Sequence, residues 1–447
     1  MAWRCGIAVR DLTPSFDAFL HGYADRDRPS AGVAEPTSLT CLALDDGERQ
    51  ALLLACDMIG IHSPIADALR ARLAAATGVP RDQILLACSH THFAPALHRE
   101  TFAAPGLGVV EPDSRFVELF GRLLQEAAQG SLAALQPAQL ETARIPVPQV
   151  VFNRRTRRAD GSVVTNYRYP LDAHNYRFSR VDSELTVLRL RSTHGMVAAL
   201  TNFGCHPVTG GQVPERDHYR ISADYPYYLR ETLSSAWQCP VAFTLGAAGD
   251  AVPIERFGDS RARIGASLGH AAALAERVFV AETAPRLWAD TVSLEVDTIF
   301  ATDPITAPSA YEAARSALLA LQQDPTTDRN SAVYQAAVQA HSQSQTAHGR
   351  ACRYPDNRYR IELQLLGCGQ TVFVGMPFEV LSEISLRLKE QCPQVVVVSC
   401  CNGYEGYLPL QHEYPRGGYE ASPASTHFAE GTADRLLALL SERLARR

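Results

Sequence analysis

The chain has 447 residues, of which 46% are hydrophobic and 20% are charged, as in a globular protein with a sizeable core. Its formal net charge is -6, which gives no reason to expect nucleic acid or an anionic membrane surface as a partner. The first residues lack a secretory signal, no apolar run approaches the roughly 18 residues of a membrane span, and the 11 cysteines include no CxxC pair; we therefore expect a cytoplasmic protein with reduced thiols and no stable membrane association.

Short apolar runs typical of strands alternate along the chain with segments of helical periodicity. In chain order, the predicted elements are a strand at 51–58, a helix at 65–77, a strand at 84–88, a helix at 116–135, strands at 185–191 and 197–203, a helix at 225–237, a strand at 241–245, a helix at 260–281, strands at 360–366 and 371–374, a helix at 380–389, a strand at 395–399 and a helix at 428–445. This mixture predicts an α/β (mixed α+β) fold in which a large mixed β-sheet core is flanked by helices.

A polar, Ala/Gln-rich stretch interrupts this pattern. Residues 309–322 and 330–349 both have helical character. We expect a helical hairpin inserted at 309–350, which either covers a site or is only a surface excursion. No shift in composition marks a domain boundary, so the hypothesis is a single domain over residues 1–447.

Two histidines follow the predicted strand 84–88, in Ser89-His90-Thr91-His92. In an extended segment, residues two apart point to the same side, so we expect both imidazoles to leave the strand together. Such a pair can bind a metal ion, or one ring can bind it while the other moves protons. A His-x-His pair alone is as often structural or incidental, so the remaining ligands must come from distant segments.

Further polar residues follow other predicted strands, where α/β folds gather ligands. His206 follows 197–203, and Glu379 follows 371–374. With His90 they make a 2-His-1-carboxylate set, which suits hydrolytic zinc with an open position for water and also suits non-haem iron. Taken singly, each residue has an ordinary interpretation: a hydrogen-bonded loop histidine, or a carboxylate favoured by a helix dipole.

An ordered set of short motifs resembles the catalytic domain of the neutral (non-lysosomal) ceramidase family. The motifs cover nearly the whole chain and are Asp11-Leu12-Thr13-Pro14, Gly22-Tyr23, Ser89-His90-Thr91-His92, Asn153-Arg154, Asn202-Phe203-Gly204-Cys205-His206-Pro207, Ser222-Ala223-Asp224-Tyr225-Pro226, Ala248-Gly249-Asp250, Pro377-Phe378-Glu379 and Gly418-Tyr419-Glu420-Ala421. Each motif is only moderately specific, but they occur in the order of the family. The resemblance implies a ceramidase-like metallohydrolase fold.

The resemblance also implies a zinc ion held by His90, His206, Glu379 and Tyr419. The implied activity is zinc-dependent hydrolysis, by a metal-activated water, of an amide (N-acyl) bond in a small soluble or lipid-like substrate. We interpret His92 as the residue that carries the proton to the leaving amine.

Two more residues acquire a role from the resemblance. Arg154 is implied to face the substrate carbonyl or a nearby anionic group, and either Arg154 or Tyr419 would stabilise the oxyanion together with the metal. The alternatives are a solvated basic loop for Arg154 and a packing role for Tyr419. Asp57 and Asp250 stand at strand ends and are candidates to orient the ligand imidazoles.

The chain departs from the family at Val252. The ceramidases have a serine two positions after the aspartate of their Gly-Asp-x-Ser-like segment, whereas valine stands at that distance from Asp250. A valine side chain is neither a nucleophile nor a hydrogen-bond donor, so a mechanism through that serine is excluded. The chain also ends at Arg447, without the family's C-terminal β-sandwich and secretion signal. We therefore expect a soluble amide as substrate: an N-acyl amine, an N-acyl amino acid or a lactam.

Two other function classes stay open. A non-haem iron oxidoreductase would use the same two histidines and one glutamate, and metal analysis with oxygen consumption distinguishes it. A non-catalytic, ceramidase-like binding protein is suggested by Val252, and loss of a measurable hydrolysis in His90→Ala would exclude it. The expected partner is a small-molecule amide, and homo-oligomerisation is left open.

Overall fold

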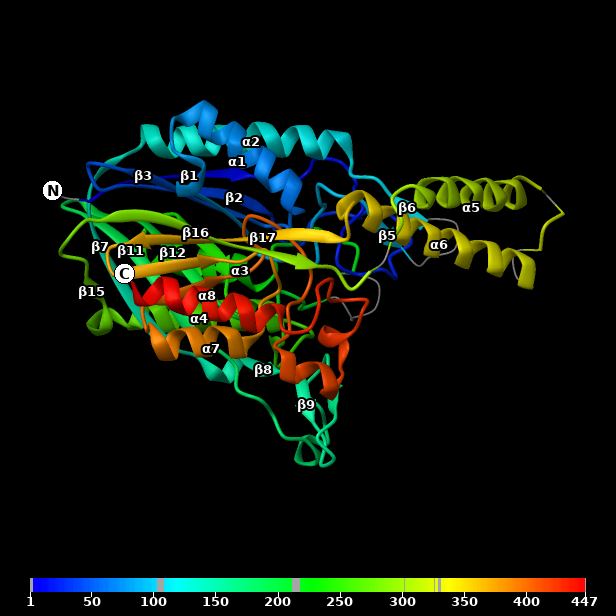
Figure 1. The fold of residues 1–447 in the computed structure, drawn as a ribbon. Helices are drawn as coiled ribbons and strands as arrows, with labels where there is room; N and C mark the ends of the chain where they lie inside the picture. The colour runs from blue at the N-terminus through cyan, green and yellow to red at the C-terminus, as the bar shows by residue number, and fades with distance from the viewer. Residues whose placement is uncertain are drawn as a thin grey trace.

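Two β-sheets packed face to face, with helices on their outer sides, form the body of the protein (Figure 1). The computed structural model describes residues 3–102, 108–210, 218–300, 302–324, 326–328 and 331–446.

Nine strands form the larger sheet. Its strands are β1 (Trp3–Asp11), β2 (Ser38–Asp45), β3 (Gln50–Cys56), β4 (Ile84–Cys88), β7 (Gln136–Pro146), β11 (Glu184–Ser192), β12 (Gly195–Phe203), β13 (Val241–Leu245) and β15 (Val280–Ala281). Eight of them follow the order β13-β12-β11-β7-β1-β2-β3-β4, and β15 pairs with β7. The sheet is mixed, because β3–β4 and β12–β13 are parallel while the other pairs are antiparallel.

The larger sheet is strongly curved. Its edge strands β4 and β13 stand at opposite ends of the strand order, yet they contact each other. The segment after β19 joins their ends, since Ser399 N–H donates to the carbonyl of Leu245 at 2.9 Å and Cys88 N–H donates to the carbonyl of Cys400 at 3.2 Å. This curvature brings together the ends of β4 and β12, the strands that lead to His90 and His206.

Four strands form the smaller sheet, in the order β16-β17-β18-β19. They are β16 (Leu287–Asp297), β17 (Arg358–Cys368), β18 (Thr371–Gly375) and β19 (Val395–Val398). The pair β18–β19 is parallel and the others are antiparallel.

A layer of buried apolar side chains joins the two sheets. Leu42 and Leu85 of the larger sheet lie in it with Leu366 and Phe373 of the smaller sheet. Alternate residues of the same strands, such as Cys41, face the helices instead. Because many strands are buried on both faces, their sequences read as continuous apolar runs.

Helices cover the outer faces of both sheets. Those on the larger sheet are α1 (Ser63–Thr77), α2 (Ser114–Ala133), α3 (Tyr225–Trp237) and α4 (Ser260–Leu274), and those on the smaller sheet are α7 (Ser382–Gln391) and α8 (Thr432–Ala445). In Figure 1, α1 and α2 lie along one side of the body and α7 and α8 along the opposite side. None of the described helices is long and apolar enough to cross a bilayer.

Short elements complete the described chain. The small two-stranded ribbons pair β5 (Glu100–Phe102) with β6 (Gly108–Val110), β8 (Val151–Asn153) with β14 (Ala251–Pro253), and β9 (Arg155–Arg157) with β10 (Val163–Thr165). Short 3-10 helices lie at Arg81–Gln83, Pro148–Val150, Ala173–Asn175, Glu276–Val278, Gln411–Arg416 and Tyr419–Ala421.

The predicted helical hairpin is present between β16 and β17. It consists of α5 (Thr306–Gln323) and α6 (Ala332–Arg353), which pack against each other and project from the body (Figure 1). The predicted start of its second helix, at residue 330, lies outside the described residues. The C-terminal end of α6 returns to the body, where it lines a cavity of about 560 Å³ with His62, His98 and His427.

The predicted mixed α/β class, with a large mixed sheet flanked by helices, is confirmed, but the sheet has a partner sheet that was not foreseen. The strands β1, β2, β7 and β16 were not predicted. The predicted helix 260–281 is too long: α4 ends at Leu274, where Ala275 N–H turns back to the carbonyl of Ala272 at 3.2 Å, and Val280 joins the sheet. The predicted helix 428–445 begins only at Thr432, because Gly431 has a left-handed φ of 83°.

Candidate metal centre

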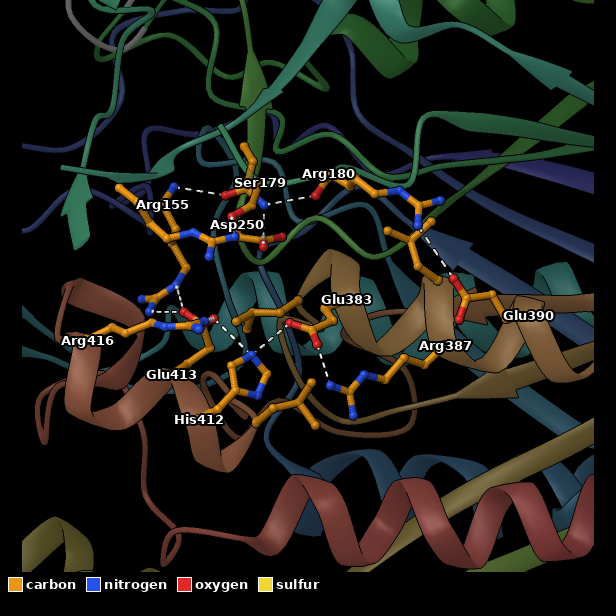
Figure 2. A pocket seen from close by; sticks show the side chains of 15 residues that line it. Arg155, Ser179, Arg180, Asp250, Glu383, Arg387, Glu390, His412, Glu413 and Arg416 are labelled. Carbon is orange, nitrogen blue, oxygen red and sulfur yellow. Dashed lines mark hydrogen bonds and ion pairs between the residues drawn. The ribbon is translucent and has the colours of Figure 1, made fainter. Parts of the chain in front are cut away.

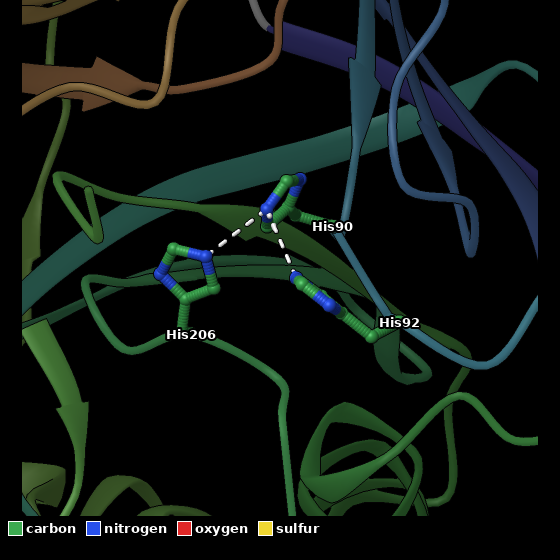
Figure 3. A group of neighbouring side chains, drawn as sticks. All are labelled: His90, His92 and His206. Carbon is green, nitrogen blue, oxygen red and sulfur yellow. Dashed lines mark hydrogen bonds between the residues drawn. The ribbon is translucent and has the colours of Figure 1, made fainter. Parts of the chain in front are cut away.

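Three imidazoles converge where the curved sheet closes (Figure 3), and the carboxylate of Glu379 lies beside two of them. His90 Nε2 lies 3.1 Å from His206 Nε2 and 3.4 Å from His92 Nε2. Oε2 of Glu379 lies 3.2 Å from His90 Nε2 and 3.1 Å from His206 Nε2. The structure therefore brings His90, His206 and Glu379 together from three distant segments, and it adds His92 to the same point.

His90 has a left-handed backbone conformation directly after β4, with a φ of 63°. The two rings do lie together, as expected, but the reason given for it is wrong, because the chain turns at His90 and is not extended there. The turn is held by the N–H of His90, which donates to the carbonyl of Met58 at 2.9 Å. A positive φ at a residue other than glycine costs energy and is found preferentially at functional sites.

Backbone carbonyls hold the outer nitrogen of each ring. His90 Nδ1 lies 2.6 Å from the carbonyl of Ile59, His206 Nδ1 lies 2.6 Å from that of Ala248, and His92 Nδ1 lies 3.0 Å from that of Gly22. A carbonyl only accepts hydrogen bonds, so Nδ1 carries the proton in each neutral ring and Nε2 presents a lone pair.

These atoms fit a bound metal ion. Three imidazole lone pairs and one carboxylate oxygen facing one another repel, unless a cation or a proton lies among them. A tetrahedral zinc ion with bonds of 2.0–2.1 Å separates its ligand atoms by about 3.3 Å. The three separations among Nε2 of His90, Nε2 of His206 and Oε2 of Glu379 are 3.1 to 3.2 Å and match that value, as does the 3.4 Å between the Nε2 atoms of His90 and His92. Oε2 of Glu379 is moreover buried without a hydrogen-bond donor among the described residues.

Burial favours the neutral form of His92 and His206, which is the form of histidine that binds metals. Burial lowers the pKa of His206 to about 4, although the neighbouring carboxylate of Glu379 acts in the opposite direction. Burial, followed by the charges of His90 and His206, also lowers the pKa of His92 well below its usual value. The pKa of Glu379 is well below its ordinary value: burial alone would raise it, but His90 and His206 outweigh that effect.

Neighbouring segments fix the position of Glu379. The hydroxyl of Tyr404 donates to Oε1 of Glu379 at 2.8 Å, which leaves Oε2 directed at the histidines. A Cβ on Gly249 would lie 2.3 Å from the backbone carbonyl oxygen of Glu379, so the turn after β13 can approach this loop only with glycine. Tyr404 was not singled out from the sequence, although it lies soon after the predicted strand 395–399, where the same strand-end rule applies.

Arg154 is buried and faces an anionic group, Glu420, with Nε 2.7 Å from Oε1. Its Nη2 also donates to the hydroxyl of Tyr407 at 2.8 Å. The alternative of a solvated basic loop is therefore wrong for this residue. Tyr419 is 42% exposed, and its ring lies 5.6 Å from that of Tyr407 between centroids. Burial raises the pKa of Tyr419, and the charge of Glu379 adds to that effect.

The two aspartates expected to orient the imidazoles do not do so. Asp57 forms an ion pair with Arg230 at 2.7 Å. Asp250 accepts hydrogen bonds from Asn153 at 2.7 Å and from the hydroxyl of Ser382 at 2.7 Å. Carboxylates this well paired are not free to turn toward a histidine, and backbone carbonyls orient the rings instead.

Val252 and the neighbouring pair Cys400 and Cys401 are packing residues. Val252 is fully buried in β14, paired with Phe152 of β8. Cys400 and Cys401 are buried, and burial raises the pKa of Cys401 to about 12. A thiol with such a pKa is not a nucleophile at neutral pH, so Cys401 has a packing role.

A separate group of charged side chains surrounds a cavity of about 420 Å³ (Figure 2). His412 Nε2 lies between Glu383 and Glu413, at 3.0 and 3.1 Å from their carboxylates. Arg387 pairs with the first carboxylate and Arg416 with the second, each at 2.5 Å. Both carboxylates already have cationic partners, so this group is a weaker candidate for a metal than the histidine cluster.

Comparison with solved structures finds the same fold in neutral ceramidase. Neutral ceramidase from Pseudomonas aeruginosa matches with a TM-score of 0.70 and 17% identity, over 99% of this chain and 75% of that chain. A structure described as ceramidase complexed with C2 matches with a TM-score of 0.71 and 17% identity, over 100% of this chain and 76% of that chain. No protein-family model and no curated protein matches the sequence. The ceramidase-like fold that the motifs implied is thereby confirmed over nearly the whole chain.

Proposed function

We propose that the chain is a zinc-dependent hydrolase that cleaves the amide bond of an N-acyl compound. The observation that carries the proposal is the convergence of Nε2 of His90, Nε2 of His206 and Oε2 of Glu379 within 3.2 Å of one another. The fold adds support, because two solved structures that share it are ceramidases. Fold similarity alone would not suffice, since one fold can host many activities.

His90, His206 and Glu379 would hold the metal, and His92 and Tyr419 are the candidates for a fourth ligand. The motifs favour Tyr419, whereas the 3.4 Å separation of the Nε2 atoms of His90 and His92 favours His92. Zinc in such a site lowers the pKa of a water toward about 7 and polarises a carbonyl.

The remaining residues bind and orient the substrate. Tyr167 and Tyr419 are 43% and 42% exposed, and their rings lie 6.2 Å apart between centroids, so they offer an aromatic lip to an acyl chain. The guanidinium of Arg154 lies next to these aromatic rings, 5.9 Å from the ring centroid of Tyr419. Its fixed positive charge favours a carbonyl oxygen that gains negative charge during attack.

Proton transfer would fall to the member of the His92/Tyr419 pair that is not a ligand. As a neutral imidazole, His92 can accept a proton at Nε2 and pass it to the leaving amine, because its Nδ1 stays bound to the carbonyl of Gly22. Tyr419 would serve instead as a hydroxyl donor at the exposed side of the centre.

The test is amine release from a panel of N-acyl amines, N-acyl amino acids, lactams and a ceramide by zinc-loaded protein. We expect hydrolysis of at least one substrate, and its loss in His206→Ala, with His412→Ala as the control that keeps activity. Turnover that needs iron and oxygen would support the oxidoreductase instead. Failure to hydrolyse any amide would support the binding protein.

A further inference from the structure

A second group of possible metal ligands lies close to the metal centre. His21, His98 and Glu100 each offer a ligand atom, and these atoms lie within 4.8 Å of one another. Tyr404 is the shared neighbour, since its ring centroid is 5.7 Å from that of His90 and 6.2 Å from that of His98. None of the three residues belongs to the cluster around Glu379.

Both imidazoles in this group are buried and incompletely paired. His21 is 2% exposed and His98 is 8% exposed, and Nδ1 of each ring is without a hydrogen bond among the described residues. Oε2 of Glu100 lies 2.9 Å from Nδ1 of His21, but it is not aligned for a hydrogen bond. Native proteins rarely leave buried polar nitrogens without a partner, so these atoms call for a ligand.

The group is held rigidly enough to serve as a site. The ring of His98 stacks on that of His62 at 3.9 Å and 17°. Both backbone polar groups of His21 are hydrogen-bonded. Its N–H donates to the carbonyl of Ala94 at 3.0 Å, and its carbonyl accepts from Nη1 of Arg26 at 2.9 Å. Such supporting contacts are what orient metal ligands.

The charge balance separates this group from the one in Figure 2. The carboxylates beside His412 are neutralised by arginines, whereas the ion pair of Glu100 within the described chain is with His21 alone. Two imidazoles and one carboxylate that forms no ion pair with an arginine among the described residues make up a donor set that zinc and neighbouring transition metals accept.

We propose that His21, His98 and Glu100 bind a second transition-metal ion of the zinc class. The side chains must close on the ion, because a tetrahedral zinc ion holds its ligands about 3.3 Å apart. The carboxylate of Glu100 is 28% exposed, so a fourth position is open to water.

This second site does not depend on the proposed hydrolase activity, but it touches the same residues. The residue after His21 is Gly22, whose carbonyl accepts the hydrogen bond from Nδ1 of His92 at 3.0 Å. An ion on His21 would therefore hold the peptide that orients the ring of His92. Its role is that of a structural ion for the metal centre.

The test is the metal content of the full chain after metal removal, reloading with Zn²⁺ and extensive dialysis. We expect two ions per chain in the natural protein, and one each in His98→Ala and His90→Ala. His412→Ala is the matched control, because the carboxylates beside His412 are already paired with arginines. This variant should keep two ions per chain. Because His98→Ala removes a buried ring, Glu100→Gln is the milder second variant, and it should weaken the second binding at least about tenfold.

Co²⁺ loading supplies a second readout, because each cobalt site has its own visible absorption. Two cobalt absorption components in the natural protein would support the second site if Glu100→Gln removes one of them. A single ion that disappears in His90→Ala and survives in both His98→Ala and Glu100→Gln would overturn it. That result would leave the proposed hydrolase intact. A single ion that is lost in His98→Ala but kept in His90→Ala would instead refute the first centre and not the second.

Discussion

At the scale of single residues, hydrogen bonds to the backbone decide what the centre can bind. Carbonyls hold Nδ1 of His90, His92 and His206, so three lone pairs face one point. The motifs implied His90 and His206 as metal ligands, together with Glu379 and Tyr419, but not His92. Sequence alone could not have placed His92, because its approach depends on the left-handed turn at His90.

The fourth ligand can be identified by removing each candidate. We expect His92→Ala to raise the dissociation constant for Zn²⁺ at least about tenfold. Tyr419→Phe keeps the ring and loses only the hydroxyl, so it should leave zinc affinity within about twofold and slow hydrolysis if the hydroxyl contacts the substrate. Competition with a chelating dye measures both constants. The opposite pattern would assign the position to Tyr419, as the motifs imply.

The buried charges next to the centre contribute to stability. Glu420 is fully buried and pairs with Arg154 at 2.7 Å and Arg155 at 2.8 Å. Glu420→Ala leaves two buried guanidinium groups without this partner, so we expect a loss of about 3–5 kcal/mol in the free energy of unfolding. Urea denaturation measures it. The control, Glu442→Ala, removes a surface pair with Arg446 and should cost about 1 kcal/mol or less. Equal losses in both variants would contradict a structural role for the buried network.

At the scale of elements, most strands that are buried on both faces could be predicted, although β2, which is also buried on both faces, was missed. The strands Ile84–Cys88 and Val241–Leu245 are apolar apart from Thr244 and were predicted with their observed bounds. By contrast, β16 carries exposed polar residues between buried ones, and β7 contains prolines and charged residues. Their place in the sheet is set by tertiary pairing, which local propensity does not report.

The turn after β13 presses directly on the loop that carries Glu379, and this contact can be tested. A Cβ at residue 249 would lie 2.3 Å from the backbone carbonyl oxygen of Glu379, so Gly249→Ala must displace one of the two segments. We expect zinc affinity to fall at least about tenfold, together with stability. In the control Gly349→Ala, on α6, a Cβ meets no atom within 4 Å. That variant should keep zinc affinity and gain up to about 1 kcal/mol. Unchanged zinc affinity in Gly249→Ala would contradict the contact.

At the scale of the whole molecule, the centre exists because the larger sheet is curved. His90 and His206 are 116 residues apart and follow β4 and β12, which are distant in the strand order. Both residues could be chosen from the sequence because they follow predicted strands. The ceramidase resemblance then implied that they bind the same metal ion. The curvature that brings the ends together depends on side-chain packing between two sheets, so no local pattern could reveal it.

A metal that bridges such distant strands should stabilise the entire fold. We expect free Zn²⁺ at 100 times its dissociation constant to add about 2.7 kcal/mol to the free energy of unfolding. Urea unfolding with and without zinc measures the difference. In His206→Ala the part of this gain that the centre contributes should be lost, whereas His412→Ala should retain the whole gain. A zinc effect of the same size in His206→Ala would place the ion elsewhere.

The central claim is that zinc held by His90, His206 and Glu379 supports amide hydrolysis. The most direct test is to measure amine release as Zn²⁺ is added back to metal-depleted protein, using a substrate that the panel identifies. We predict that activity is absent at first, rises with zinc, saturates as the centre fills, and stays absent in Glu379→Ala. Activity that is independent of zinc, or that survives in Glu379→Ala, would contradict the claim.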